Sequence, residues 1–319
     1  MTLRASLPVS VILCTHNPRA DFLDKTLASL RAQTLGLDHW ELLLIDNRSD
    51  DPLASRLRLD WHPRARVVRE DELGLTPARL RGLAEAQGEL LVFVDDDNIL
   101  QNDYLAVAVD LATSCPFLGA WGGSTIGEFE VAPPDWARPY LCYLAIREVT
   151  RFVWGNEYRY DLVPTGAGLC VRRSIAETYA RATRPDPLRR ELGRRGAALT
   201  SGEDSDLAFT AVDLGFGLGL SPRLSLRHLM PASRLQLAYL ERLLEGVAHS
   251  GALVLQLRGG GVPSHGSSSR LDRWLAAYRL WRQPPAVRRL ERARARGAAA
   301  AGRLIADRFR SRPAPSVPF

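Results

Sequence analysis

Short apolar runs alternate with amphipathic segments along the first hundred residues of this chain. The runs at residues 9–14, 41–45 and 90–94 are almost wholly apolar, which is typical of strands buried on both faces of a parallel sheet. Residues 22–34 carry leucine and phenylalanine at helical spacing and predict an amphipathic helix. A second helix is predicted over residues 77–87, because proline stands at its start and glycine directly follows its end.

Each of the three predicted strands ends in a polar loop, and Val67 and Val68 indicate a further short strand. Strands and helices that alternate in this way predict a βαβαβ half of a doubly wound α/β sheet, which commonly binds a nucleotide. The chain has neither G-x-G-x-x-G nor a Walker lysine motif at this place. A dinucleotide site or an ATP-cleaving site would therefore lack its phosphate loop.

Three consecutive aspartates, Asp95, Asp96 and Asp97, follow the apolar run at residues 90–94. Ligands of open α/β sheets bind beyond the carboxyl ends of the strands, where these carboxylates should lie. Burial would raise their pKa values unless a cation neutralises them, and Mg²⁺ and Mn²⁺ suit oxygen ligands. The alternative is a solvated acidic turn, but such turns rarely follow so apolar a strand.

The net charge of +6 is unevenly distributed. Residues 270–319 hold thirteen arginines and three acidic residues, a charge of +10, so the rest of the chain carries −4. The four widely spaced cysteines indicate reduced, buried thiols in a cytosolic protein. The N-terminus shows no cleavage signature, and no apolar stretch is long enough for a bilayer. A cytoplasmic location is therefore expected.

Four segments together resemble the motifs of family 2 glycosyltransferases, which are inverting enzymes of the GT-A fold. They are VSVILCTHNP, LLLIDNRSDD, GLTPARLRGLAEAQGELLVFVDDDN and GEDSDLAFTAVDLGF, in the order and spacing of the family. The resemblance implies transfer of a sugar from a nucleotide diphosphate sugar to an acceptor hydroxyl. It also implies a Rossmann-like α/β domain over residues 1–230, with a nucleotide-binding half (about 8–98) and an acceptor-binding half (about 99–230). Residues 231–319 form a helical, arginine-rich extension with a flexible end.

The resemblance assigns the donor site to residues near the ends of the first, second and fourth strands. It implies nucleotide-sugar binding by Thr15, His16, Asn17, Asp46, Arg79, Asp95 and Asp96. Asp50 or Asp51 could assist, and Arg81 is an alternative to Arg79. Asp46 could instead cap the loop as an Asx-turn residue.

The same resemblance implies a metal held mainly by Asp97, with Asp95 and, as a further candidate, His228. The expected cofactor is Mn²⁺ or Mg²⁺. Arg234 resembles a diphosphate-facing arginine of this region. His228 could equally be structural, as isolated histidines often are.

Acceptor binding is expected in the Gly-, Pro- and aromatic-rich middle of the chain, with Trp121, Gly166, Gly168 and Glu203 as candidates. Glycines let a backbone approach a ligand closely, and aromatic faces stack on sugar rings, although most aromatic side chains are core. Residues 163–173 should contain a strand entered through a glycine turn. The acceptor is a carbohydrate, a lipid-linked molecule or a small molecule.

Catalysis is assigned by the resemblance to Asp204, with Glu203 beside it. A carboxylate there would take the proton of the acceptor hydroxyl, opposite the metal-bound leaving group. Asp204 could instead serve only as a cap in the first turn of a helix. Asp206 is expected to be a solvated first-turn acid.

The C-terminal segment predicts a helix on which Trp274, Tyr278 and Trp281 share one face with two leucines, while arginines point elsewhere. Such a face suits either packing on the domain or peripheral contact with an anionic membrane at its inner face. A glycine- and serine-rich linker precedes this helix.

Two other functions compete with sugar transfer. A sugar nucleotidyltransferase would need a glycine-rich phosphate loop, for which THNPR is a poor substitute. A nucleic-acid-binding protein could use the basic tail, but no nucleic-acid motif is present and the body is acidic, so no nucleic-acid partner is expected.

Overall fold

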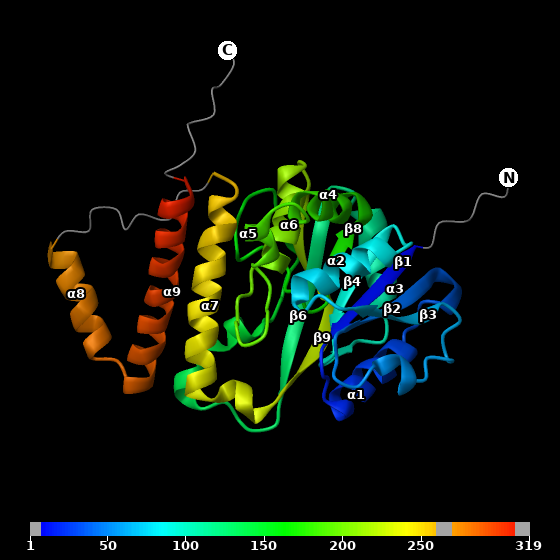
Figure 1. Cartoon of the computed structure of the whole chain (residues 1–319), viewed down its shortest axis with the longest axis horizontal. Helices are drawn as coiled ribbons and strands as arrows, with labels where there is room; N and C mark the ends of the chain where they lie inside the picture. The colour runs from blue at the N-terminus through cyan, green and yellow to red at the C-terminus, as the bar shows by residue number, and fades with distance from the viewer. Residues whose placement is uncertain (1–7, 260–269, 310–319) are drawn as a thin grey trace, which may run out of the picture.

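The computed structural model describes residues 8–259 and 270–309. One twisted sheet forms its centre, with the strand order β3-β2-β1-β4-β8-β6-β9-β5, and β7 pairs with β9 (Figure 1). The strands are β1 (Val9–Thr15), β2 (Trp40–Asn47), β3 (Ala65–Glu70), β4 (Leu90–Asp95), β5 (Asn98–Leu100), β6 (Leu118–Phe129), β7 (Val153–Gly155), β8 (Cys170–Arg172) and β9 (Gly217–Met230).

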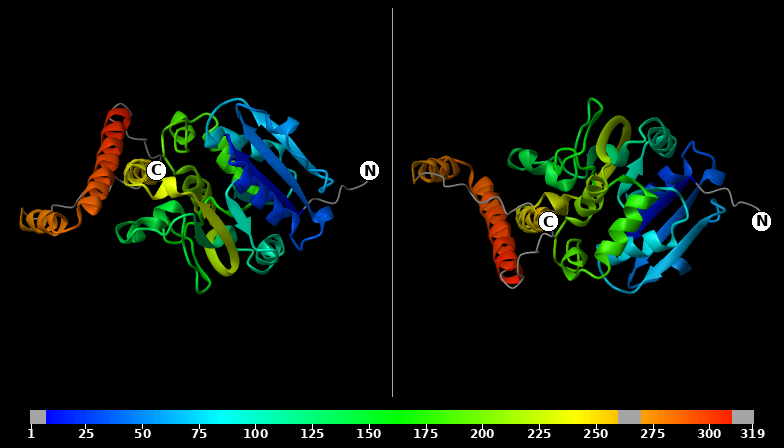
Figure 2. Two further views of the ribbon diagram at one scale, coloured as in Figure 1. Left: turned by 90° about the horizontal axis from the view of Figure 1, so that it is seen from below. Right: turned by 90° about the horizontal axis from the view of Figure 1, so that it is seen from above.

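Helices cover both faces of this sheet and continue beyond it (Figures 1 and 2). The α-helices are α1 (Ala20–Arg31), α2 (Leu75–Glu85), α3 (Tyr104–Ser114), α4 (Arg173–Thr183), α5 (Pro187–Arg190), α6 (Glu203–Asp213), α7 (Leu237–Gln256), α8 (Arg270–Trp281) and α9 (Pro285–Phe309). Short 3₁₀ segments are η1 (Leu37–His39), η2 (Leu53–Ser55), η3 (Asp135–Leu144) and η4 (Ala232–Leu235).

Alternate residues of the parallel strands face two separate cores. Val11 and Leu13 of β1 pack in a cluster with α1 and α3, whereas Ile12 between them packs in the cluster of α2, α4 and α6. Successive side chains of a strand point to opposite faces, so a strand covered on both sides must be apolar at every position. This requirement explains the continuous apolar runs of the sequence.

The predicted βαβαβ half is confirmed. β1, β2, β3 and β4 are parallel and carry the predicted apolar runs, and β8 provides the strand expected after the glycine turn. α2 begins at Leu75, two residues before the predicted start, because Gly74 adopts a φ of 140° and Pro77 fits within the first turn. Its last residue is Glu85 rather than residue 87.

Strands β5, β6, β7 and β9, in the mixed half of the sheet, were not predicted. β6 and β9 nevertheless pair along most of their length. Both strands are interrupted by glycines, which weaken a hydrophobic strand pattern. Gly123 of β6 shows why a side chain is excluded, since a Cβ there would lie 2.0 Å from the carbonyl oxygen of Leu224. The close backbone approach thus removes the sequence signal.

The C-terminal extension is helical, as predicted, and it packs onto the sheet domain. α7 and α9 lie side by side, and Leu290 of α9 shares a buried cluster with Leu243 and Leu244 of α7. Leu253 of α7 and Ala301 of α9 join the cluster that contains α6. The boundary at residue 230 remains a prediction. Most of the predicted linker, residues 258–270, and all of the predicted flexible end, residues 311–319, lie outside the described residues.

The four cysteines are free thiols, but only Cys170 is buried; Cys14 and Cys115 are partly buried and Cys142 is exposed, contrary to the expectation that all four are buried. Within the described part of the chain, no helix combines the length and apolar character needed to cross a membrane.

Close contact between α7 and α9 leads to a prediction. A Cβ on Gly297 of α9 would lie 2.0 Å from the carbonyl oxygen of Glu245, whereas Gly302 on the same helix has no atom within 4 Å of that position. We expect Gly297→Ala to displace α9 from α7 and to increase hydrogen exchange along α9. Gly302→Ala should be neutral or stabilise the helix by up to about 1 kcal/mol. Equal protection of α9 in the two variants would contradict this packing.

Candidate active site

A pocket of about 300 Å³ opens at the carboxyl ends of β1, β2 and β4. Its walls come from distant parts of the chain: the loop after β4, the start of α2, the end of η3, the loop before α6, and β9. The residues that line it include Thr15, His16, Asn47, Arg79, Asp95, Asp96, Asp97, Tyr143, Leu144, Ala145, Gly166, Arg194, Ser201, Glu203, Asp204, His228 and Arg234. The edge of the sheet therefore collects carboxylates and arginines in one cavity.

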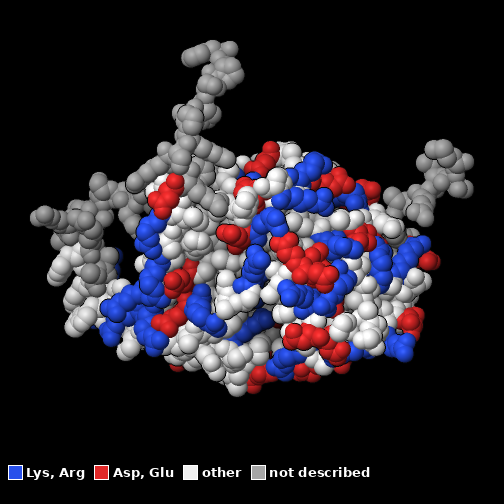
Figure 3. Space-filling view, viewed as in Figure 1, with Lys and Arg blue, Asp and Glu red and all other residues white. Residues whose placement is uncertain are grey.

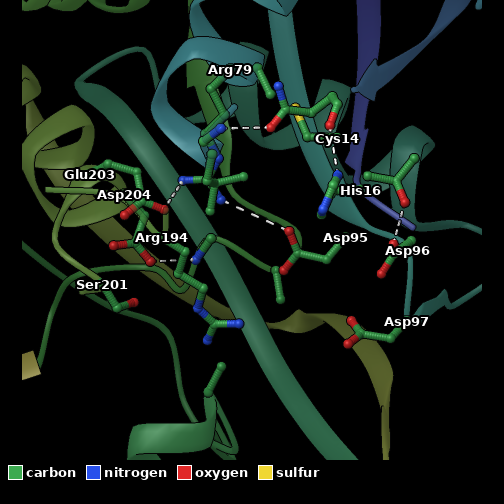
Figure 4. Close-up of a pocket in the computed structure, with 18 of the residues that line it drawn as sticks. Cys14, His16, Arg79, Asp95, Asp96, Asp97, Arg194, Ser201, Glu203 and Asp204 are labelled. Carbon is green, nitrogen blue, oxygen red and sulfur yellow. Dashed lines mark hydrogen bonds and ion pairs between the residues drawn. The ribbon is translucent and has the colours of Figure 1, made fainter. Parts of the chain in front are cut away.

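The aspartate triplet lies on one side of this pocket, and Glu203 and Asp204 lie on the other (Figure 4). The side chain of Asp95 is 36% exposed, while that of Asp97 is buried. Burial raises the pKa of Asp96 to about 7, the charge of Asp97 adds to this rise, and a hydrogen bond from the Thr15 hydroxyl opposes it. The triplet is part of a pocket wall and not the alternative solvated turn.

Asp97 lies between a histidine and an arginine. One of its oxygens lies 3.2 Å from Nε2 of His228, and the other lies 2.8 Å from Nη2 of Arg234. Burial by itself would raise its pKa, but His228 and Arg234 lower the pKa of Asp97 well below its usual range. The carboxylate is therefore ionised at neutral pH. His228 and Arg234, which the sequence analysis assigned to the metal and diphosphate region, both contact it.

Arg79 connects the two sides of the pocket. Its buried guanidinium lies 3.0 Å from Oε1 of Glu203 and 3.9 Å from Oδ1 of Asp95. Burial raises the pKa of Glu203 to about 7, although the charge of Arg79 opposes that rise. The alternative, Arg81, does not line the pocket and pairs with Glu85 along α2.

Asp204 lies in the first turn of α6 and faces the pocket. Its Oδ2 accepts a hydrogen bond of 3.0 Å from the amide of Gly166, and its Oδ1 accepts one of 2.7 Å from the amide of Ser205. A Cβ on Gly166 would lie 2.6 Å from Arg79, so glycine is required where these groups meet. Asp204 thus stabilises the start of the helix and also presents its carboxylate to the cavity.

Asp206 does not have the solvated position predicted for it. Its side chain is fully buried and pairs with Arg258, in the turn after α7, at 2.6 Å and with Arg189 of α5 at 2.9 Å. The prediction was wrong because two arginines remote in sequence compensate a charge that would otherwise be too costly to bury. This cluster fixes α6, and with it Asp204, against two neighbouring helices.

Trp121, a predicted acceptor contact, is fully buried in the core beside β4 and cannot touch a ligand in this structure. Gly168 also lies outside the pocket wall, where its carbonyl accepts a hydrogen bond of 2.6 Å from Tyr104. Its φ of 76° explains the glycine by backbone conformation. Both residues therefore have structural roles.

Asn17 and Asp46 stand next to the pocket rather than in its wall. The oxygens of the buried Asp46 accept hydrogen bonds from the amides of Ser49 and Leu53, and Arg69 pairs with it at 2.9 Å. Asp46 thus caps the loop after β2, as in the alternative, but its amide partners lie three and seven residues on and not two, as an Asx-turn requires. A role of these two residues in nucleotide binding stays a prediction.

Several lining residues were missed in the sequence. Arg194 and Ser201 come from the loop before α6, and Tyr143 and Leu144 come from the end of η3. Only the adjacent arginines at positions 194 and 195 offered a signal, and such pairs are common on surfaces. Asn47 directly follows Asp46, and its side chain holds the β3–α2 loop through the amide of Gly74 at 2.8 Å.

The sequence and the geometry can now be compared with known proteins. The family model described as glycosyl transferase family 2 matches residues 10–177, which is more than half of the chain. The chain belongs to glycosyltransferase family 2. Its mixed sheet with helices on both faces and further C-terminal helices confirms the predicted GT-A fold. Of the functions considered above, membership supports glycosyl transfer.

Two curated relatives illustrate the range of the family. The glucosyl-dolichyl phosphate glucuronosyltransferase of Haloferax volcanii is 24% identical over 133 residues, which cover 40% of this chain and 42% of that protein. The cholesterol galactosyltransferase of Borreliella burgdorferi is 32% identical over 107 residues, covering 33% of this chain and 29% of that protein. The matches span about half of the curated relatives' length or less.

The carboxylate oxygens in the pocket of this glycosyltransferase fit a divalent cation whose remaining ligands would be phosphate oxygens. Mg²⁺ is usually held by one or two carboxylates together with water and substrate phosphates. Asp95 and Asp97 provide such oxygens in the pocket wall, and Nδ1 of the buried His228 has no hydrogen-bond partner. Among the residues described, no set of three or more His, Cys, Asp or Glu side chains could hold a metal by itself.

Burial of Glu203 predicts a pH-dependent stability. Its pKa in the folded chain is about 7, against an ordinary value of 4.5, so the folded state holds a proton that the unfolded state has lost between these values. The free energy of unfolding should therefore fall as pH rises from about 5 to 7, by roughly 1 to 3 kcal/mol from this group. We expect urea unfolding of Glu203→Gln to lack this part of the decrease.

The matched control is Glu157→Gln, which removes an exposed glutamate outside the pocket. It should keep the pH dependence of the parent. If Glu203→Gln loses as much stability between pH 5 and 7 as the parent does, Glu203 is not the group that binds the proton.

Proposed function

We propose that this glycosyltransferase moves a sugar from a nucleotide diphosphate sugar to an acceptor hydroxyl, with inversion at the anomeric carbon. The observation that carries the proposal is that the aspartate triplet and Asp204 line opposite sides of one pocket. Inversion by direct displacement needs the leaving group on one side of the sugar and a single base on the other. The two carboxylate groups supply these two positions.

The nucleotide is assigned to the wall formed by β1, β2 and the triplet. Thr15, His16 and Asn47 line this part, and Asp96 is the candidate for the ribose hydroxyls. Asp96 is held by Thr15, so its orientation is set before a ligand binds. The family resemblance gives the same assignment to the loop after β1.

The diphosphate is assigned to the arginines of the pocket. Arg79 is buried beside Asp95, Arg234 is paired with Asp97, and Arg194 approaches from the loop before α6. Asp97 and Asp95 would hold Mg²⁺ or Mn²⁺, which supplies charge neutralisation for the departing diphosphate. A bound diphosphate would give Arg234 a second anionic partner, because arginine pairs with phosphate oxygens as readily as with carboxylate oxygens.

Asp204 is the proposed base. The acceptor oxygen attacks the anomeric carbon while its proton passes to the Asp204 carboxylate, and the bond from that carbon to the diphosphate oxygen breaks. The amide of Gly166, 3.0 Å from Oδ2, holds the carboxylate in place. The nucleoside diphosphate leaves with the electron pair of the broken bond.

The acceptor is assigned to the wall formed by Tyr143, Leu144 and Ala145, which offers one aromatic and two aliphatic side chains. An acceptor carried on a lipid is supported by the names of two relatives, which refer to glucosyl-dolichyl phosphate and to cholesterol. A carbohydrate or small-molecule hydroxyl would undergo the same chemistry. Thermal-shift measurements with a panel of nucleoside diphosphates and Mn²⁺ would identify the donor base.

Asp97→Asn should separate metal-dependent binding from folding. The substitution keeps the shape of the side chain but removes the charge that a cation needs. Titration calorimetry should show that the affinity for the preferred nucleoside diphosphate falls at least ten-fold and no longer responds to Mn²⁺. Asp135→Asn, which alters an exposed aspartate of η3, is the control. Unchanged affinity with an unchanged metal response would remove Asp97 from the site.

Asp204→Asn should separate catalysis from binding. The amide cannot take the acceptor's proton, so transfer should fall by roughly 10² to 10⁴ while donor binding stays close to that of the parent. Asp60→Asn, which alters an exposed aspartate outside the pocket, is the control and should transfer normally. The product's anomeric configuration, read by proton NMR, should be inverted. Retained activity in Asp204→Asn, or a retained configuration, would refute this mechanism.

A further inference from the structure

An exposed aromatic face lies on α8, the helix farthest from the sheet in Figure 1. Trp274, Tyr278 and Trp281 are 62%, 44% and 69% exposed. The rings of Trp274 and Tyr278 are stacked at 5.7 Å, and those of Tyr278 and Trp281 at 6.2 Å. Single exposed aromatics are common, but a continuous row of three large rings is typical of an interaction surface. The alternative of packing on the domain does not apply to these rings.

The helix that carries this face also carries positive charge. Arg279 of α8 and Arg282, directly after it, are exposed, and Arg292 is exposed on α9. Residues 270–319 as a whole carry +10 against −4 for the remainder of the chain. Figure 3 shows blue side chains gathered at the α9 end of the molecule. The partner of this surface should therefore be anionic and able to take up aromatic rings.

Contacts through α9 tie this end of the molecule to the pocket. The Tyr140 hydroxyl of η3 donates a hydrogen bond of 3.0 Å to Glu291 of α9, and Leu144 shares a buried cluster with Leu290. Leu144 and its neighbour Tyr143 line the pocket wall. The segment that forms the proposed acceptor wall is thus braced by the helix that leads to the aromatic face.

We propose that the aromatic face of α8, with Arg279 and Arg282, docks on an anionic lipid bilayer. Tryptophan and tyrosine rings sit at the headgroup level of a bilayer, and arginines near them are attracted to its negative surface. A second copy of the chain is a poorer partner, since it would bring two strongly basic ends together. Docking here would anchor the molecule through its helical end, which contacts η3 through the hydrogen bond between Tyr140 and Glu291.

The test is sedimentation of the full chain with vesicles of phosphatidylcholine alone or mixed with phosphatidylglycerol. The parent should bind the anionic vesicles and release them at high salt, and it should bind the neutral ones weakly. Trp274→Ala with Trp281→Ala should weaken binding at least ten-fold. Arg279→Gln with Arg282→Gln should weaken it roughly 25-fold, since each arginine near such a surface contributes about five-fold.

The matched control is Trp154→Ala on β7, which removes a tryptophan that is 53% exposed but lies outside α8. It should bind vesicles as the parent does. The proposal fails if the Trp274 and Trp281 substitutions leave vesicle binding unchanged, or if they instead abolish a dimer seen by sedimentation equilibrium. It also fails if the parent binds an RNA or DNA duplex through these residues and does not bind vesicles. Because the vesicle assay contains no nucleotide sugar, its outcome does not depend on the proposed transfer reaction.

Discussion

The structure depends on how the carboxylates at the sheet edge are neutralised, and Arg79 is the central element of that arrangement. Its guanidinium is buried between Glu203, which begins α6, and Asp95, which ends β4. The ion pair with Glu203 therefore joins the parallel half of the sheet to the half that carries the proposed base. Removing one partner of such a buried pair leaves an uncompensated charge, which typically costs about 3 to 5 kcal/mol. A pocket this rich in acid can exist only because its cations are built in.

The parallel half of the fold could be predicted from the sequence because burial on both faces demands uninterrupted apolar strands, as in residues 90–94. The mixed half could not, because its strands obey a different constraint. In β6 and β9 the backbones approach so closely that glycine replaces the side chains a strand pattern needs, and Gly123 is the clearest instance. The hydrophobic pattern of a strand is therefore lost where the two backbones lie closest together. The C-terminal extension was predicted to be helical as a whole, but only α8 was predicted as an individual helix, from the spacing of its aromatic and leucine side chains.

The same reasoning applies to the site. Residues that directly follow a strand, such as Asp95 and Asp97, were located well because strand ends converge at one edge. Residues whose role depends on a distant partner were not. Asp206 was predicted to be solvated, but it is buried between Arg189 and Arg258. Trp121 was predicted to contact a sugar, but it is buried in the core. Arg194 reaches the pocket from a loop with no periodic pattern, so only the three-dimensional arrangement reveals it.

The structure also bears on which carboxylate of the Glu203–Asp204 pair is better placed to accept a proton. Glu203 is 2% exposed, and one of its oxygens faces Arg79 at 3.0 Å. Burial raises the pKa of Glu203 to about 7, but a proton taken up there weakens the ion pair with Arg79 that joins the two halves of the sheet. Asp204 is oriented instead by the backbone amides of Gly166 and Ser205. These hydrogen bonds can persist through proton transfer, because each carboxylate oxygen has a second lone pair. The arrangement therefore favours Asp204 for the acceptor's proton and Glu203 for holding Arg79 in position.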